Sequence, residues 1–178
     1  MRVNSLLGTA VVLSLLLTSS APSHAEVRQG DAVTISQEEV IDDDLYVFAQ
    51  KVTVDGMIKG DLIVFAQQIN INGSVDGDLI AAAQQVLVNG KVSDDARIAG
   101  QVLTLQDGAD IGDDLIAASY SHECTKSSHI GGEVSYAGFQ SVFAGRVDKK
   151  VGLASANIEL SGSFGDDIEA VVDGGDYG

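Results

Sequence analysis

The stretch Gly60–Asp76, GDLIVFAQQININGSVD, is followed at once by Gly77–Ser93, GDLIAAAQQVLVNGKVS. The two segments share a Gly-Asp-Leu start, a Gln pair and an Asn-Gly pair at matching positions. A fixed period in this range is typical of stacked structural units, none of which can bury its apolar face alone. The repeat therefore predicts a solenoid built turn by turn.

The same phase continues through most of the chain. Within each unit, apolar residues alternate with polar ones, which is the pattern of short β-strands with one buried face. A second apolar pair recurs in most units, beginning with Val33 and Ile35 and ending with Ile158 and Leu160. We predict an all-β, single-domain β-helix over residues 33–172, with about seven to eight turns of 17–19 residues. The repeating first position is occupied by Leu45, Leu62, Leu79, Ala96, Leu115, Val134, Val151 and Ile168.

The first 25 residues have a different character from the rest. They carry one charge, Arg2, then the apolar run Leu6–Leu17 and the small residues of Ser23-His24-Ala25. This pattern predicts a signal peptide and an exported protein, periplasmic or extracellular; the alternative is an N-terminal anchor that is not cleaved. Residues 26–32 are expected to be a lead-in to the β-helix and residues 173–178 a C-terminal tail.

The chain is strongly acidic, with a formal net charge of −16. Phosphate backbones and anionic lipid surfaces repel such a chain, because no counterions would be released on binding, so nucleic acid is excluded as a partner. No transmembrane domain is expected after signal removal. Its single cysteine, Cys124, excludes an internal disulfide. Neutral or cationic partners remain, among them a second copy, a cell-envelope protein or a glycan.

One register position is acidic in almost every turn. Like charges stacked at the inter-strand spacing repel, so they must be solvated, hydrogen-bonded at a turn, partly protonated or neutralised by cations. The simpler interpretation is that each Asp satisfies backbone N–H groups of a turn, and the alternative is a column of calcium ligands. No other cofactor is expected. The column consists of Asp44, Asp61, Asp78, Asp95 and Asp114, then Glu133.

His122, Cys124 and His129 resemble metal ligands at first sight. In register, however, His122 and Cys124 follow Leu103 and Leu105, which predicts two inward-facing core residues and a two-residue bulge. Their spacing matches no established zinc pattern, and no Ser/His/Asp order suggests hydrolysis, so no metal site and no catalytic residue are predicted.

Two other columns recur with the period. Glycines such as Gly56, Gly73 and Gly90 are expected at corners that need positive φ, and a Gln column beginning at Gln50 and Gln67 is expected to form an amide ladder.

An apolar strip is predicted on the outside of the first strand of three turns, and exposed strips of this kind usually mark an interface. The open ends of the β-helix are a second predicted interface, because an unpaired strand edge templates further strands. The strip contains Tyr46, Phe48, Ile63, Phe65 and Ile80, and the ends contain Val33, Ile35, Ile158, Leu160 and Ile168.

The turns of the form Gly-Asp-Leu-x6-Ile-x-Ile-x-Gly-x-Val, as in Gly60–Val75, resemble those of the bactofilins, a polymer-forming cytoskeletal family of bacteria. The resemblance covers about Val33 to Ile168. It implies a three-sided, right-handed β-helix that assembles end to end into filaments without nucleotide and has no catalytic residues. An export signal and the absence of polar, proline-containing tails depart from the family pattern. The leading hypothesis is an exported, non-enzymatic, self-assembling structural protein; the alternative is a monomeric periplasmic or surface β-helix that binds glycan or cations.

Overall fold

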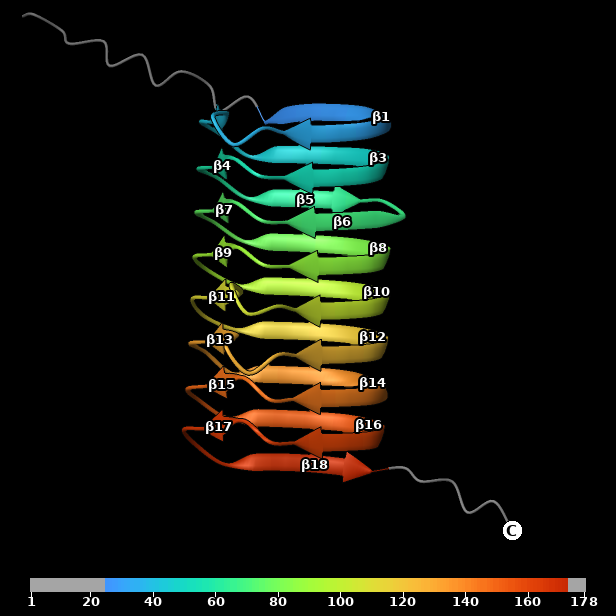
Figure 1. Cartoon of the computed structure of the whole chain (residues 1–178), viewed down its shortest axis with the longest axis vertical. Helices are drawn as coiled ribbons and strands as arrows, with labels where there is room; N and C mark the ends of the chain where they lie inside the picture. The colour runs from blue at the N-terminus through green and yellow to red at the C-terminus, as the bar shows by residue number, and fades with distance from the viewer. Residues whose placement is uncertain (1–24, 173–178) are drawn as a thin grey trace, which may run out of the picture.

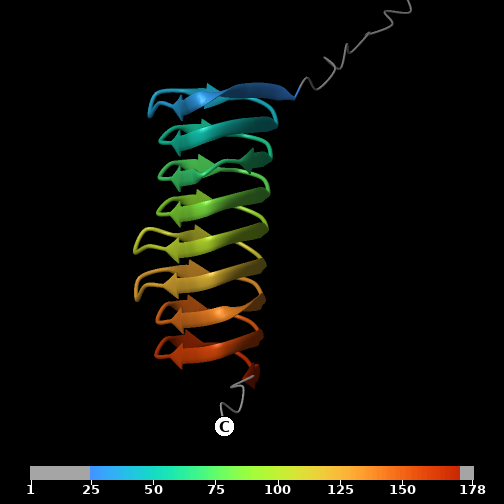
Figure 2. The ribbon, with the colours of Figure 1, turned by 90° about the vertical axis from the view of Figure 1, so that its right-hand side faces the viewer.

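The computed structural model describes residues 25–172, and this part of the chain contains strands and turns without any helix. All the strands pair in parallel and stack into a β-solenoid, which Figure 1 shows with its long axis vertical. Figure 2 shows the same stack from the side, with successive turns lying one below the other. The predicted all-β solenoid is confirmed.

Two parallel ladders make up the stack. The longer contains β1 (Glu26–Ile35), β3 (Leu45–Val54), β5 (Leu62–Phe65), β6 (Gln68–Ile71), β8 (Leu79–Val88), β10 (Ala96–Leu105), β12 (Leu115–Cys124), β14 (Val134–Phe143), β16 (Val151–Leu160) and β18 (Ile168–Val172). The shorter contains β2 (Val40–Ile41), β4 (Met57–Ile58), β7 (Ser74–Val75), β9 (Lys91–Val92), β11 (Asp110–Ile111), β13 (His129–Ile130), β15 (Arg146–Val147) and β17 (Ser163–Phe164).

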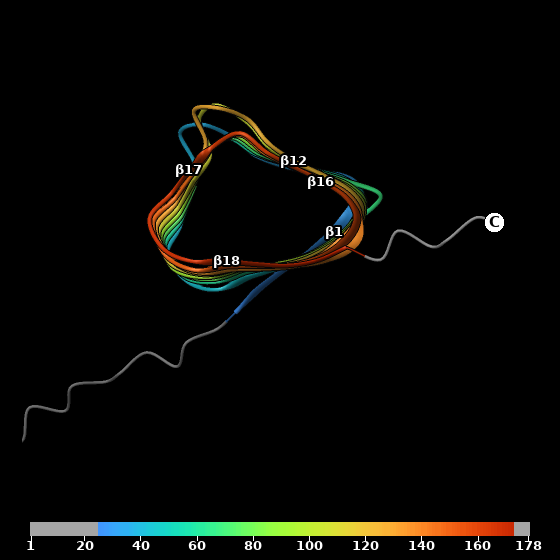
Figure 3. The ribbon, with the colours of Figure 1, turned by 90° about the horizontal axis from the view of Figure 1, so that it is seen from below.

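Each turn has three sides, and the end-on view has a roughly triangular outline (Figure 3). A long strand bends midway, so its first half forms what we call the first side and its second half the second side. In the third turn the bend divides the strand into β5 and β6. The two-residue strands form the third side.

Nine strands follow one another on the path from β1 to β18, so the solenoid has about nine turns, close to the seven to eight predicted. β1 begins at Glu26 and pairs with β3 from its first residue, so residues 26–32, expected as a lead-in, are part of the first turn. The signal-peptide prediction for residues 1–25 falls almost wholly outside the described residues, and the tail 173–178 falls outside them entirely.

Turns of nineteen residues carry their two extra residues in one place. A tight turn between the second and third sides, such as Gln106–Ala109 or Thr125–Ser128, is closed by a backbone hydrogen bond between its ends, 2.9 Å and 3.1 Å long respectively. The bulge leaves the strand register intact, because Leu103 still pairs with His122.

The core is a continuous column of inward-facing side chains. Leu45 and Val47 on the first side, Val52 and Val54 on the second and Ile58 on the third are all fully buried, and their counterparts repeat down the stack. Because parallel pairing places identical positions directly above one another, each apolar side chain stacks on its own counterpart.

The glycine corners have a different cause from the one expected. No described glycine has a positive φ. At Gly73 an added Cβ would collide with the carbonyl oxygen of Gly56, and at Gly90 with that of Gly73. Glycine is required there because successive backbones approach too closely for a side chain. The expected amide ladder is also wrong: the only side-chain hydrogen bond of the described Gln column runs from Gln50 to Asp31, at 2.9 Å.

Candidate functional site

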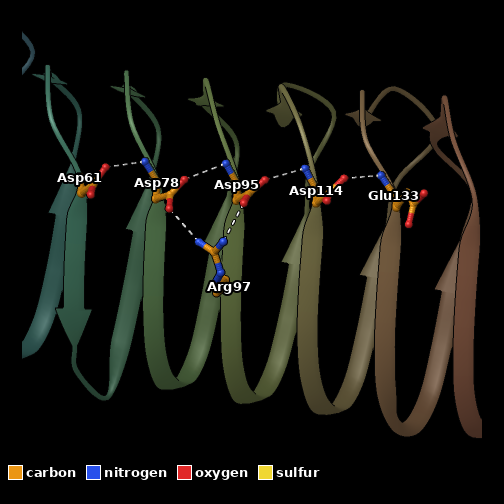
Figure 4. A network of polar contacts seen from close by, with 6 residues as sticks. All are labelled: Asp61, Asp78, Asp95, Arg97, Asp114 and Glu133. Atoms are coloured by element: carbon orange, nitrogen blue, oxygen red, sulfur yellow. Dashed lines mark hydrogen bonds and ion pairs between the residues drawn. The ribbon is translucent and has the colours of Figure 1, made fainter.

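The acidic column is a hydrogen-bonded ladder along one edge of the first side (Figure 4). Asp44 Oδ1 accepts the backbone N–H of Asp61 at 2.9 Å, and Asp61 Oδ1 accepts that of Asp78 at 2.9 Å. The pattern continues through Asp95 and Asp114 and ends at Glu133, whose N–H donates to Asp114 Oδ1 at 2.7 Å. Each carboxylate therefore satisfies a backbone donor of the next turn, which confirms the simpler interpretation of the column.

The glycine before each Asp makes room for this ladder. An added Cβ at Gly77 would collide with Asp61 Oδ1, and one at Gly132 with Asp114 Oδ1. Where the preceding residue is Asp94 or Asp113 instead, the ladder bond lengthens to 3.1 Å. The repeated Gly-Asp dipeptide thus acts as one unit, with the glycine admitting the carboxylate of the turn before.

Cationic side chains offset part of the column's charge. Arg97 donates to Asp78 and to Asp95, each at 2.7 Å, and Lys149 reaches Asp113 at 3.2 Å. Asp95, Asp113 and Asp114 bring three carboxylate oxygens within 4.8 Å of one another, the one described grouping that could hold a cation. Two of these three carboxylates already have a cationic partner, and calcium binding stays a prediction.

His122 and Cys124 point into the core, as the register predicted, and each is 1% exposed. His122 Nε2 lies 3.1 Å from Cys124 Sγ, and His122 Nδ1 has no hydrogen-bond partner. Burial lowers the pKa of His122 to about 3 and raises the pKa of the Cys124 thiol to about 12. Both groups are therefore neutral at pH 7, and neither has the exposure that reactivity demands.

His129, in contrast, lies at the surface of the third side. Its Nδ1 is 2.8 Å from Asp110 and its Nε2 3.1 Å from Asp148, one acid in the turn before and one in the turn after. Hydrogen bonds to Asp110, and then to Asp148, raise the pKa of His129 above its usual value. No sequence signal singled out this bridge, because Asp148 lies two residues beyond the register position of His129, which Arg146 occupies in that turn.

The predicted apolar strip faces outward on the first side. Phe48 and Phe65 are about half exposed and stack with their ring centroids 5.6 Å apart, and Ile80 is also exposed. Tyr46 and Ile63 are partly covered. The strip thus offers its two Phe rings and Ile80 to a partner.

Below the strip, the same side is hollowed into what we call the alanine groove, with a volume of about 760 Å³. Its floor continues the Phe48 and Phe65 positions as a run of small residues, and Ile80 and Ile116 line it as well. Sequence reasoning missed this groove, although the switch from Phe to Ala at one register position was a visible signal. The floor residues are Ala82, Ala99, Ala118, Ala137 and Ala154.

The two ends of the described solenoid differ in character. At the N-terminal end, Glu26 and Arg28 occupy the inward positions that Leu45 and Val47 hold one turn later. Arg28 donates to Glu26 and to Glu39, each at 2.6 Å, and so closes that end with an ionic cluster. Val33 and Ile35, predicted as end-interface residues, are buried on the second side of the same turn. No sequence signal singled out this cluster, because Glu39 joins it from the segment between β1 and β2, at a separation of 11 residues from Arg28.

At the C-terminal end the column of core positions is open. Ile158 is partly buried, whereas Leu160 and Ile168 are each 38% exposed at positions that are fully covered in earlier turns. Phe164 on the third side is also only partly covered. This end therefore presents apolar core positions to its surroundings.

No protein-family model matches this chain, and no curated protein or solved structure matches it either. Within the described residues there is no helix long and apolar enough to cross a membrane. The resemblance to the bactofilins stays a prediction that rests on the repeat.

Proposed function

We propose that this chain is an exported, non-enzymatic structural protein that associates end to end into filaments without nucleotide, as the bactofilin resemblance implies. The observation that carries the proposal is the open C-terminal end, where Leu160 and Ile168 occupy core positions with nothing described over them. Because more than half of each side chain is already covered, completing its burial is worth about 1–2 kcal/mol each, which favours association through this surface.

The strand edges support the same contact. β1 and β18 are the terminal members of the longer ladder, and each pairs on one side only within the described residues. Unpaired N–H and C=O groups on a terminal strand accept a further strand readily. The N-terminal end carries the Glu26–Arg28 cluster and Val40, which is 47% exposed. In a contact between opposite ends, the apolar side chains of the C-terminal end would therefore lie partly over Val40 and partly over this charged cluster. A head-to-tail contact repeats without closing and generates a filament.

The test is electron microscopy and analytical ultracentrifugation of the exported form over a range of concentrations. We expect filaments whose mass grows with concentration in the native protein, and short particles for Ile168→Lys and Leu160→Lys. Gln84→Lys, exposed in the middle of the stack, is the matched control and should assemble like the native protein. Filaments that persist in both end variants, or a native protein that never elongates, would refute end-to-end assembly.

Export is tested separately by expressing the full chain and fractionating the cells. We expect the protein outside the cytoplasm with its N-terminus at Glu26. A protein retained in the cytoplasm at full length would contradict the signal-peptide prediction without affecting the assembly proposal.

A further inference from the structure

We infer that the first side of the solenoid is a self-complementary docking surface on which a second copy packs face to face, with the two solenoid axes antiparallel. This contact uses the side of the stack and does not depend on the end-to-end contact proposed above.

The first side has a projecting half and a hollow half. At one register position the chain runs from Phe48 and Phe65 through five alanines to Val171, as consecutive strand pairs show. The neighbouring outward position likewise carries Tyr46 and Ile63 at the N-terminal end and Ser135 and Gly152 near the C-terminal end. Large apolar side chains thus project from β3, β5 and β8, and small ones cover β14 and β16. Arg97 and the half-exposed Ile116 lie between these two regions, and Glu169 and the exposed Val171 lie at the C-terminal end.

A two-fold axis that runs parallel to the strands, between β10 and β12, brings these regions together. It places β5 of one copy over β16 of the other, so Phe65 faces Ala154 and Ile63 faces Gly152. It also places β8 over β14, so Ile80 faces Ser135, and β10 over β12, so Arg97 faces Ile116. At the margin β3 lies over β18, so Phe48 faces Val171 and Tyr46 faces Glu169. A parallel arrangement would instead set Phe48 and Phe65 against their own counterparts, leaving both hollows empty. Closed dimers require a patch that complements itself under a two-fold axis, and only the antiparallel arrangement satisfies this.

The dimensions fit a stable dimer. Eight turns overlap in this arrangement, and at about 4.8 Å per turn with a first side of about five residues at about 3.3 Å they give a face of roughly 630 Å². Standard interfaces bury about 800 Å² per partner. Alanine on the floor allows two sheets to approach closely, as small side chains do in tightly packed sheet pairs.

The charges around the groove also favour an apolar occupant. Its lining includes two charged side chains, and both are paired: Arg97 with Asp78 and Asp95, and Glu169 with Lys150 at 2.8 Å. The acidic ladder borders the face, and the two-fold axis brings Asp95 of one copy near Asp114 of the other. Like charges at the rim oppose association and are screened by salt, so the dimer should tighten as ionic strength rises.

The test uses the exported form carrying Ile168→Lys, which removes the end contact, in sedimentation-velocity runs at low and high salt. We expect a monomer–dimer equilibrium that strengthens with salt. Ala118→Glu, beside the axis, should weaken it at least about 10-fold, as a buried unpaired charge does at an interface core. Gln140→Glu, which is exposed and lies beyond the groove lining, is the control and should leave the equilibrium unchanged.

The orientation is tested by thiol cross-linking in a Cys124→Ala background with a short bifunctional reagent. Cys at position 118 should link to itself across the axis, whereas Cys at Gln29, in the first turn, should not. Because Gln29 and Ala118 share one register position, a parallel arrangement would self-link both, so self-linking at position 29 would establish the parallel arrangement and overturn the inference. A monomer under all salt conditions would overturn it as well, and this failure would leave the end-to-end proposal intact.

Discussion

The Oδ1 atom of Asp61 accepts the backbone N–H of Asp78 at 2.9 Å, one full turn further along the chain. This bond fixes the height of each turn on the one before at the corner where the first side begins. The bond also explains why an acidic residue recurs at a position where like charges repel. Leaving the backbone N–H without an acceptor would cost more free energy than the repulsion between neighbouring solvated carboxylates.

The ladder requires an acceptor oxygen rather than a charge. We expect Asp61→Ala to lower the free energy of unfolding by about 1–3 kcal/mol, since the N–H of Asp78 loses its partner. Asp61→Asn keeps an oxygen at the same place and should cost much less. Urea unfolding of both variants measures the difference, and equal losses would show that charge, not the acceptor, is what matters.

The glycine beside the ladder is a steric requirement. Gly77→Ala introduces a Cβ against Asp61 Oδ1 and should destabilise the fold by about 1–3 kcal/mol. The matched control is Asp94→Ala, at the equivalent position one turn later, where a Cβ is already present; its effect should stay within about 0.5 kcal/mol. Thermal unfolding compares the two, and the expectation fails if Gly77→Ala is as stable as the control.

The buried imidazole should make the fold acid-sensitive. Burial lowers the pKa of His122 to about 3 in the folded state. Between about pH 6.5 and pH 3, His122 is therefore protonated in the unfolded chain and neutral in the folded chain. Stability from this group is complete above pH 6.5 and is lost as the pH falls toward 3, by up to about 4–5 kcal/mol.

His122→Leu, which repeats the Leu103 of the turn before, should remove this loss. The free energy of unfolding of the variant minus that of the native protein is measured from pH 4 to pH 7. It should grow as the pH falls, and a difference independent of pH would contradict the buried neutral imidazole.

The surface histidine should act in the opposite direction. The pKa of His129 is raised, chiefly by Asp110 and then by Asp148, so its contribution is complete below the unfolded value of about 6.5 and disappears as the pH rises through the folded value. His129→Gln should therefore be destabilising at pH 5.5 and nearly neutral at pH 8.5. An NMR titration of the native protein supplies the direct check, and a His129 pKa below 6.5 would refute the bridge.

The buried thiol should be inert in the folded protein. Cys124 is 1% exposed and burial raises its pKa to about 12, so little thiolate exists at neutral pH. Folded protein should react with a thiol reagent only as fast as it unfolds, and denaturant should restore full reactivity. Rapid labelling of the native protein, or a disulfide-linked dimer under oxidising conditions, would place Cys124 outside the core.

The repeat alone was enough to predict the solenoid, its strand phase and its inward residues. A period of 17 residues with alternating apolar positions is compatible with few folds. Because the strands of successive turns pair in parallel, residues at the same position of the repeat stack directly on one another. For this reason even the inward direction of His122 and Cys124 could be predicted from Leu103 and Leu105.

Other features depend on spacing in three dimensions and emerge only from the folded chain. Gly73 is needed because the carbonyl of Gly56 lies against it, which no propensity for positive φ could indicate. The ionic closure by Arg28 and Glu39 joins separate parts of the first turn, and the hollow beneath Phe65 arises from residues of several turns. Such features depend on which residues the folded chain brings together. The sequence repeat predicts the strands and corners of each turn, but it does not predict where the stacked turns together form projections and grooves.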